Sequence, residues 1–230
     1  MCQEILRTLL HDPELIVLSV ISQHTEKSLY REITLDAKCI MGDGSICNIE
    51  VQKGNINDDI RRVRFHVAVL TANNTPKGIE FKDVPDVKVL YITEYDALKV
   101  GKAVVHVTRC ADDGNGYRPL DDGEDIIFAN TEAPGTEQET HLLKLFLRKD
   151  AFNDEMYPAL SEAVIYFKEK EGGVREMCKA VQEYAEMYAE DKKNEWRQEE
   201  MIALVKEGLL KISDAAKRVS MSEEEFKKLI

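Results

Sequence analysis

Residues Thr34–Gln52 constrain the fold of this chain most, because apolar and polar side chains alternate in two runs on either side of a turn signal. Gly42–Asp43–Gly44 supplies the turn, since glycine and aspartate tolerate the positive φ angles of tight hairpins. The segment therefore predicts a β-hairpin. A turn centred on the middle residue places Asp36 directly opposite Glu50.

Asp36 and Glu50 would then form a pair of opposed carboxylates. Side chains directly across two strands have Cβ atoms about 5 Å apart, and like charges there are destabilising. Such a pair indicates a cation between the carboxylates. The alternative is two solvated acids on an exposed sheet face, since surface acids are common. Gln52 follows on the same face as Glu50, whereas the two-residue period sends Lys53 to the opposite face.

Paired oxygen ligands favour Mg²⁺, which takes one or two carboxylates, keeps several waters and is completed by substrate phosphates. Such a metal activates water and stabilises charge on a scissile phosphate. Gln52 could orient the attacking water or a phosphate oxygen, although a neutral amide is neither a base nor a cation. His66, further along, is expected as a packing residue rather than a ligand.

The segment after the hairpin is locally basic, through Lys53, Arg61, Arg62 and Arg64. We expect a helix over residues 57–72, with Asn57 as its N-cap, so the three arginines lie near its start. There they are well placed for contacts with DNA phosphates. Taken alone, the arginines also fit a solvated helix face.

The formal net charge of −12 is unevenly distributed and does not exclude DNA as a partner. Residues 1–109 carry 14 basic and 15 acidic side chains, whereas residues 110–230 carry 17 and 28. The apolar runs are too short to cross a bilayer, and no secretory signal is recognisable, so we expect a cytoplasmic protein. Cys39 and Cys47 face each other in the predicted hairpin, and in a reducing compartment they are expected as buried free thiols.

Further along the chain, the pattern indicates a helix over 3–10 and strands over 87–93 and 103–108, with a short strand near 125–129. A strand–helix–strand order favours an α/β fold with a crossover on a mixed sheet. From Glu137 onward the pattern is helical, with one helix over 158–170 and another beginning near Val174. We expect a core over 1–150, a helical extension over 151–200 and a small hairpin over 201–230.

Several segments of the sequence resemble the PD-(D/E)XK nuclease family transposases, relatives of the recombination-promoting nucleases. These segments are Leu35–Asp36, Cys47–Lys53, Arg61–His66, Asp83–Asp96, Gly101–His106 and Tyr166–Val174. The resemblance implies a restriction-endonuclease-like mixed sheet flanked by helices, with Mg²⁺-dependent cleavage of double-stranded DNA in mobile-element or recombination activity.

The resemblance also implies roles for particular residues. It makes Asp36 and Glu50 metal ligands, and it puts Gln52 where many members of the superfamily have lysine. The first helix of family members often adds an acid, for which Glu4 and Asp12 are the candidates here. The alternative is a catalytically degenerate member that binds DNA or a protein without cutting.

The tail, residues 202–230, resembles a helix–turn–helix, with Ser222 and Glu225 forming a capping box on its second helix. A recognition helix reads bases with its first residues. Here these residues are Glu223–Glu225, a poor match for a phosphate-lined groove. We therefore expect packing or homo-oligomerisation through the tail, with DNA reading by a regulator as the alternative. We expect no membrane partner.

Overall fold

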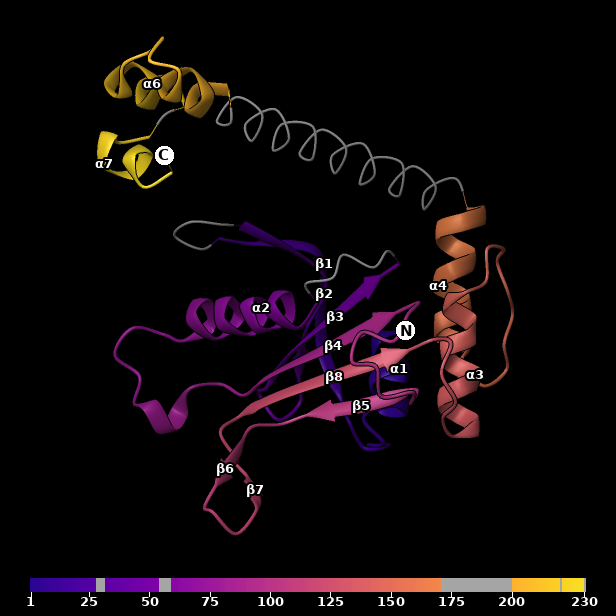
Figure 1. Ribbon diagram of the computed structural model, residues 1–230. Coiled ribbons are helices and arrows are strands. Elements are labelled where there is room, and N and C mark those ends of the chain that lie inside the picture. Colours follow the sequence, from indigo (N-terminus) through magenta and orange to yellow (C-terminus); the bar gives the residue numbers. More distant parts are fainter. Residues whose placement is uncertain (28–31, 54–58, 171–199, 220, 230) are drawn as a thin grey trace. The chain divides into compact units, whose positions relative to one another are not determined.

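The computed structural model describes residues 1–27, 32–53, 59–170, 200–219 and 221–229 (Figure 1). The chain divides into two compact units, Met1–Glu169 and Lys170–Ile230. The first unit contains the sheet and the second contains the small C-terminal helices, and each is described by itself below.

A mixed six-stranded sheet is the centre of the first unit in the described part of the chain. Its strands, in spatial order, are β1 (Val17–Lys27), β2 (Glu32–Met41), β3 (Ile46–Gln52), β4 (Val87–Thr93), β8 (Glu124–Asn130) and β5 (Val104–Val107). The first three strands pair antiparallel, β3, β4 and β8 pair parallel, and β5 returns antiparallel. This arrangement confirms the predicted restriction-endonuclease-like α/β fold.

The hairpin of β2 and β3 has the predicted register, with Cys39 opposite Cys47. Its turn is held by Asp43, whose carboxylate accepts hydrogen bonds from the backbone and hydroxyl of Ser45, at 2.9 and 2.7 Å. Gly44 adopts a φ of 87°, which glycine tolerates without the strain a side chain would cause. Both cysteines are buried free thiols, as expected.

Helices cover both faces of the sheet (Figure 1). On one face, α2 (Asp59–Asn74) packs over Val87, Val89 and Tyr91 of β4. On the other, apolar side chains of the hairpin and of β4 and β8 share a core with three helices. These are α1 (Cys2–Leu9), α3 (Glu137–Phe146) and α4 (Pro158–Glu169). The crossover from β3 through α2 to β4 gives the parallel pairing that the strand–helix–strand pattern predicted.

Strand boundaries match the sequence pattern where strands are continuously apolar. The strand predicted over 87–93 is β4, and the helix predicted over 57–72 is seen as α2, although Asn57 lies outside the described residues. The strand near 125–129 extends over Glu124–Asn130 and is a central strand. Within the predicted loop, β6 (Cys110–Asp112) and β7 (Tyr117–Pro119) form an extra antiparallel hairpin. The helix predicted from Val174 also lies outside the described residues.

The second unit has a small core of its own, built on Met201, Ala215, Ala216 and Phe226. Its described helices include α6 (Ile212–Arg218), α7 (Glu223–Lys227) and a helical segment over residues 200–206. The predicted capping box of Ser222 and Glu225 is present. Among the described helices, none is both long and apolar enough to span a bilayer.

Candidate active site

The strands β2 and β3 separate at the level of Asp36. Their pairing runs as far as Ala37 and Ile49, after which β3 continues beside β4 alone and β2 continues beside β1 alone. Val51 donates its backbone N–H to Oδ2 of Asp36 at 2.9 Å, so a carboxylate ties the two strands together where the ladder ends. In β1, Gln23 lies at the same level and has a φ of 49°. The backbone is thus irregular on both sides of Asp36.

Glu50 is buried at this opening, with 4% of its surface exposed. Asn48, two residues earlier on the same face of β3, donates from Nδ2 to Glu50 Oε1 at 2.8 Å. Nδ1 of His66 lies 3.3 Å from the same oxygen, and the His66 side chain is also buried. The hydrogen bond from Asn48 therefore orients this buried carboxylate, and the His66 imidazole lies beside it.

Arg62 approaches Asp36 from α2, one helical turn before His66, so the two side chains lie on the same face of the helix. Burial is the largest cause that raises the pKa of Asp36, and the neighbouring Glu50 carboxylate is the second; the net pKa is about 6. The Val51 N–H, the Arg62 cation and His66 act in the opposite direction. Burial and the Glu50 charge therefore destabilise the ionised Asp36 carboxylate by more than these three groups stabilise it.

Several buried polar atoms around the two carboxylates have no hydrogen-bond partner among the described residues. Among the described residues, the buried side-chain atoms without a hydrogen-bond partner are Asn48 Oδ1, Arg62 Nε, His66 Nδ1 and Thr131 Oγ1. All but the last belong to side chains around the two carboxylates. The His66 contact with Glu50 is close enough for an ion pair but lacks hydrogen-bond geometry. Native interiors leave few such atoms, so a cluster of them indicates a site prepared for a ligand.

The donor set fits a hard cation better than a soft one. Among the described residues, no group of three His, Cys, Asp or Glu side chains could hold a metal ion. Within the described ranges, Asp36 and Glu50 thus form a pair of carboxylates without a third such ligand, which is fewer than the four protein ligands of a structural zinc site. A pair of carboxylates suits Mg²⁺, which retains waters and accepts phosphate oxygens from a substrate.

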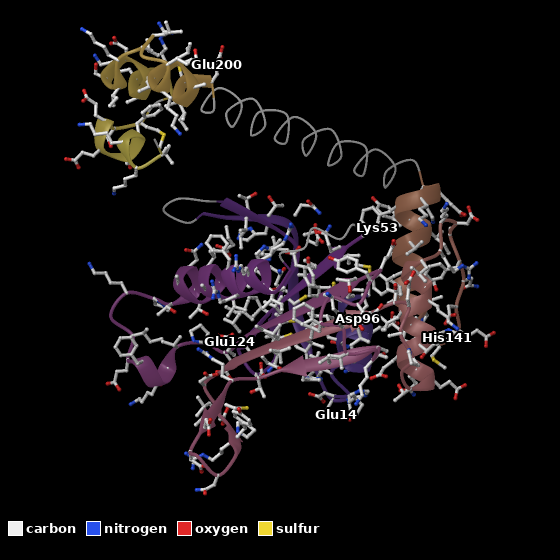
Figure 2. All side chains as sticks on the ribbon, viewed as in Figure 1. Glu14, Lys53, Asp96, Glu124, His141 and Glu200 are labelled. Carbon is white, nitrogen blue, oxygen red and sulfur yellow. The ribbon has the colours of Figure 1, made fainter. Side chains whose placement is uncertain are left out.

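The other residues predicted for the site are dispersed. Gln52 is half-buried at the end of β3, in register with Thr93 of β4. Lys53 follows the strand and is 74% exposed, with Nζ 3.8 Å from Glu94 Oε1 (Figure 2). Arg61 and Arg64 are exposed on α2. The arginines are thus divided, since only Arg62 turns toward the carboxylates.

The two acids suggested for the first helix have other roles. The carboxylate of Glu4 accepts hydrogen bonds from the backbone N–H groups of Ala159 and Leu160, at 2.9 and 2.7 Å. It therefore caps the start of α4, where a negative charge is stabilised by the helix dipole. Asp12 lies in the following turn and accepts a hydrogen bond from the backbone of Glu14.

Sequence reasoning missed two residues that contact Glu50, and each carried a usable signal. Asn48 is one strand period before Glu50, so the hairpin pattern itself places it on the same face. His66 is four residues after Arg62, which puts both on one helix face. The expectation that His66 is a packing residue is right about its burial, but it omits the contact with Glu50.

A comparison with protein-family models identifies the family of this chain. A model of the PD-(D/E)XK nuclease family transposases matches residues 3–198, a range that contains the whole sheet, α2 and both acids. No curated protein and no solved structure gives a significant match to the chain. Because the family model covers most of the sequence, the chain belongs to the PD-(D/E)XK nuclease family transposases.

Proposed function

We propose that the protein is a Mg²⁺-dependent endonuclease that hydrolyses phosphodiester bonds of double-stranded DNA, in the movement or recombination of DNA elements. One observation carries the proposal. Where β2 and β3 separate, Asp36 and Glu50 are brought together with buried polar atoms that have no partner among the described residues. Family membership supplies the nuclease context.

Asp36 and Glu50 would hold the metal, which when bound supplies an activated water and stabilises charge on the scissile phosphate. The protein prepares both ligands in advance. Asn48 fixes one oxygen of Glu50, and the backbone N–H of Val51 fixes one oxygen of Asp36. Such preorganisation keeps the carboxylates from having to reorient during the reaction. Gln52, at the end of the same strand, is proposed to orient the attacking water or a phosphate oxygen.

Positive side chains near the site provide the proposed DNA contacts. Arg61 and Arg64 are exposed on α2, and Lys53 is exposed just after β3. These side chains suit backbone phosphates, which position a duplex without reading its sequence. The buried free cysteines fit a reducing compartment, so we place the activity in the cytoplasm.

The test is incubation of the purified protein with supercoiled plasmid in Mg²⁺ and, separately, in EDTA. We expect nicked or linear DNA with Mg²⁺ and intact plasmid with EDTA. Asp36→Asn should be inactive, whereas Glu80→Gln, which removes an exposed carboxylate beside Lys82, should cut like the wild type. Cutting that persists in EDTA, or in Asp36→Asn, would refute the proposed metal site.

A second candidate is a degenerate family member that binds DNA or a protein without cutting. The observation in its favour is that the described residues provide a pair of carboxylates and no third His, Cys, Asp or Glu ligand. A duplex oligonucleotide bound with measurable affinity but left intact in Mg²⁺ and in Mn²⁺ would favour this candidate.

A further inference from the structure

The site needs a cation that its β3 sequence does not provide. In the (D/E)XK pattern the lysine follows the acidic ligand by two residues, but here that position is Gln52, a neutral amide. The adjacent Lys53 does not replace it, because its side chain is 74% exposed and its ammonium lies 3.8 Å from Glu94. Any positive side chain that supplements the metal at the scissile phosphate would therefore come from another element.

Arg62 is the residue on α2 that meets this need. It lies one turn before His66, whose ring nitrogen is 3.3 Å from Glu50, so the helix presents both side chains toward the carboxylates. Arg61 and Arg64, on either side of Arg62 in the sequence, are exposed instead.

The Arg62 guanidinium also retains unused binding capacity. Its Nε is buried without a hydrogen-bond partner among the described residues. A guanidinium has five N–H donors in a planar fork that matches two oxygens of a phosphate. The nearby Asp36 and Glu50 would be shared with a metal, so a phosphate oxygen is the acceptor that satisfies Arg62 without competing for those carboxylates.

We propose that Arg62 is the catalytic cation of this centre, and that its guanidinium binds the scissile phosphate beside Asp36 and Glu50 in the place of the lysine of the (D/E)XK pattern. The inference rests on the proposed nuclease function and deepens it. It separates Arg62, which contacts the reacting phosphate, from Arg61 and Arg64, which contact the flanking DNA backbone.

The first experiment compares Arg62→Met with Arg61→Ala in Mg²⁺, using a supercoiled plasmid over a range of concentrations. Methionine keeps an apolar stem for packing and removes the charge. We expect Arg62→Met to lower kcat by about 10²–10³-fold with a smaller change in KM, the loss typical of removing one donor to a developing oxyanion. Arg61→Ala should raise KM more than it lowers kcat. Arg62→Lys should fall between Arg62→Met and the wild type, because it restores the charge without the fork.

Chemical rescue provides a readout that a merely structural role would not give. Guanidinium chloride at low millimolar concentration should restore part of the cutting by Arg62→Ala and should not affect Asp36→Asn. Circular dichroism and thermal unfolding establish that each variant is folded. If Arg62→Ala fails to fold, the kcat and KM values of Arg62→Met and Arg62→Lys still decide the question.

The outcomes separate the two proposals. A wild-type protein that leaves plasmid intact in both Mg²⁺ and Mn²⁺ overturns the nuclease function, and with it this inference. A wild type that cuts, together with an Arg62→Met variant that cuts equally fast or matches Arg61→Ala in kcat and KM, overturns the role of Arg62 alone. Loss of kcat in Arg62→Met with rescue of Arg62→Ala by guanidinium supports it.

Discussion

Two clusters of charged groups lie on β2, two residues apart, and they differ in how completely their hydrogen bonds are satisfied. In the first, Lys38 donates to Glu26 at 2.6 Å and to Asn74 at 2.8 Å. Asn73 donates to the second oxygen of Glu26 at 2.7 Å. This cluster joins β1 and β2 to the end of α2, and its charged groups form hydrogen bonds with one another and with the two asparagines. In the second, around Asp36, several buried polar atoms have no hydrogen-bond partner within the part of the chain that the structure describes.

The pKa directions follow the same division. Burial opposes ionisation of Glu26, but hydrogen bonds from Lys38 and Asn73 more than offset it, so its pKa is lowered. Burial and the Glu50 charge raise the pKa of Asp36, and the groups around it do not restore the ordinary value. The buried charges of the first cluster therefore stabilise the protein's own structure. The Asp36 carboxylate of the second cluster is less stabilised by its neighbours, as is common for groups that bind a ligand or a metal.

The largest expected effect is loss of DNA cutting when Asp36 or Glu50, the two acids of the second cluster, is removed. Asp36→Ala and Glu50→Ala should each reduce the cleavage rate by about 10³-fold or more, comparable with removal of a catalytic acid in other hydrolases. Plasmid nicking in Mg²⁺ measures the rate, with Glu80→Gln as the matched control. If the variants lose activity while Mg²⁺ still raises their melting temperature as in the wild type, the carboxylates are not metal ligands.

Substitutions in the first cluster, around Lys38 and Glu26, should change the stability of the protein rather than its activity. Lys38→Met removes the ammonium from the buried Glu26 carboxylate and leaves it beside Asn73 and His24. Breaking a buried ion pair in this way typically costs about 3–5 kcal/mol. The double variant Lys38→Met with Glu26→Gln should recover most of that loss, because no uncompensated charge remains. Urea unfolding of the wild type, the single variant and the double variant measures the difference. Equal loss in both variants would mean that the ion pair itself, rather than the unpaired charge, dominates.

The sequence predicted the register of the β2–β3 hairpin better than the contacts of Lys38, for a physical reason. Strand alternation and a glycine-containing turn determine register locally, so Cys39 opposite Cys47 followed from the hairpin pattern. The pattern did not predict that the ladder ends at Ala37 and Ile49, one residue before Asp36 and Glu50. Lys38 pairs with Glu26 on another strand and with Asn74 at the far end of a helix. Such contacts depend on how separate elements pack, and a single sequence carries no spacing rule for them.

The directions of the arginine side chains on α2 were not predicted, although the sequence carries a signal for them. Three arginines in four positions were assigned one role, but the helix turns Arg62 inward and leaves Arg61 and Arg64 exposed. The face that α2 presents to the sheet is fixed by tertiary packing of Val63, Val67 and Leu70. Reading Arg62 and His66 against that apolar stripe would have indicated a shared, buried face.

A smaller effect is expected from neutralising the destabilised acid. Asp36→Asn keeps an oxygen to accept the Val51 N–H and removes the charge, so in EDTA it should raise the free energy of unfolding at neutral pH by about 1–3 kcal/mol. The folded state binds the Asp36 proton more tightly than the unfolded state does, so ionisation of Asp36 lowers the stability of the wild type. This loss of stability is absent well below pH 3.8, where the carboxyl is protonated in both states. It grows as the pH rises and is complete above about 6.

Urea unfolding at pH 4 and pH 7.5 measures this difference between Asp36→Asn and the wild type. The gain from the substitution should be larger at the higher pH. A gain that is equal at both pH values would show that the Asp36 carboxyl titrates in the folded protein as it does in the unfolded chain.

Removing an exposed arginine should have a still smaller effect, limited to binding. Arg64→Ala should weaken affinity for duplex DNA similarly across sequences, and it should reduce the slope of log affinity against log salt by about 0.9, as loss of one phosphate contact does. Fluorescence anisotropy at several salt concentrations measures both. Lys82→Ala, an exposed lysine paired with Glu80, is the matched control for loss of one positive charge. An unchanged slope in Arg64→Ala would return this residue to a solvated helix face.

The smallest expected effect on DNA cutting comes from removing the tail, residues 202–230. The proposed ligands lie on β2 and β3, and the sheet is completed by strands of the first unit. The described tail has its own small core around the buried Phe226, and the first turn of α7 exposes Glu223, Glu224 and Glu225, which repel phosphate. We therefore expect the tail to affect assembly rather than chemistry. Light scattering should show a lower oligomeric state after truncation, with plasmid cutting per protomer maintained. A truncated protein with unchanged assembly but altered site preference would instead make the tail a DNA-reading element.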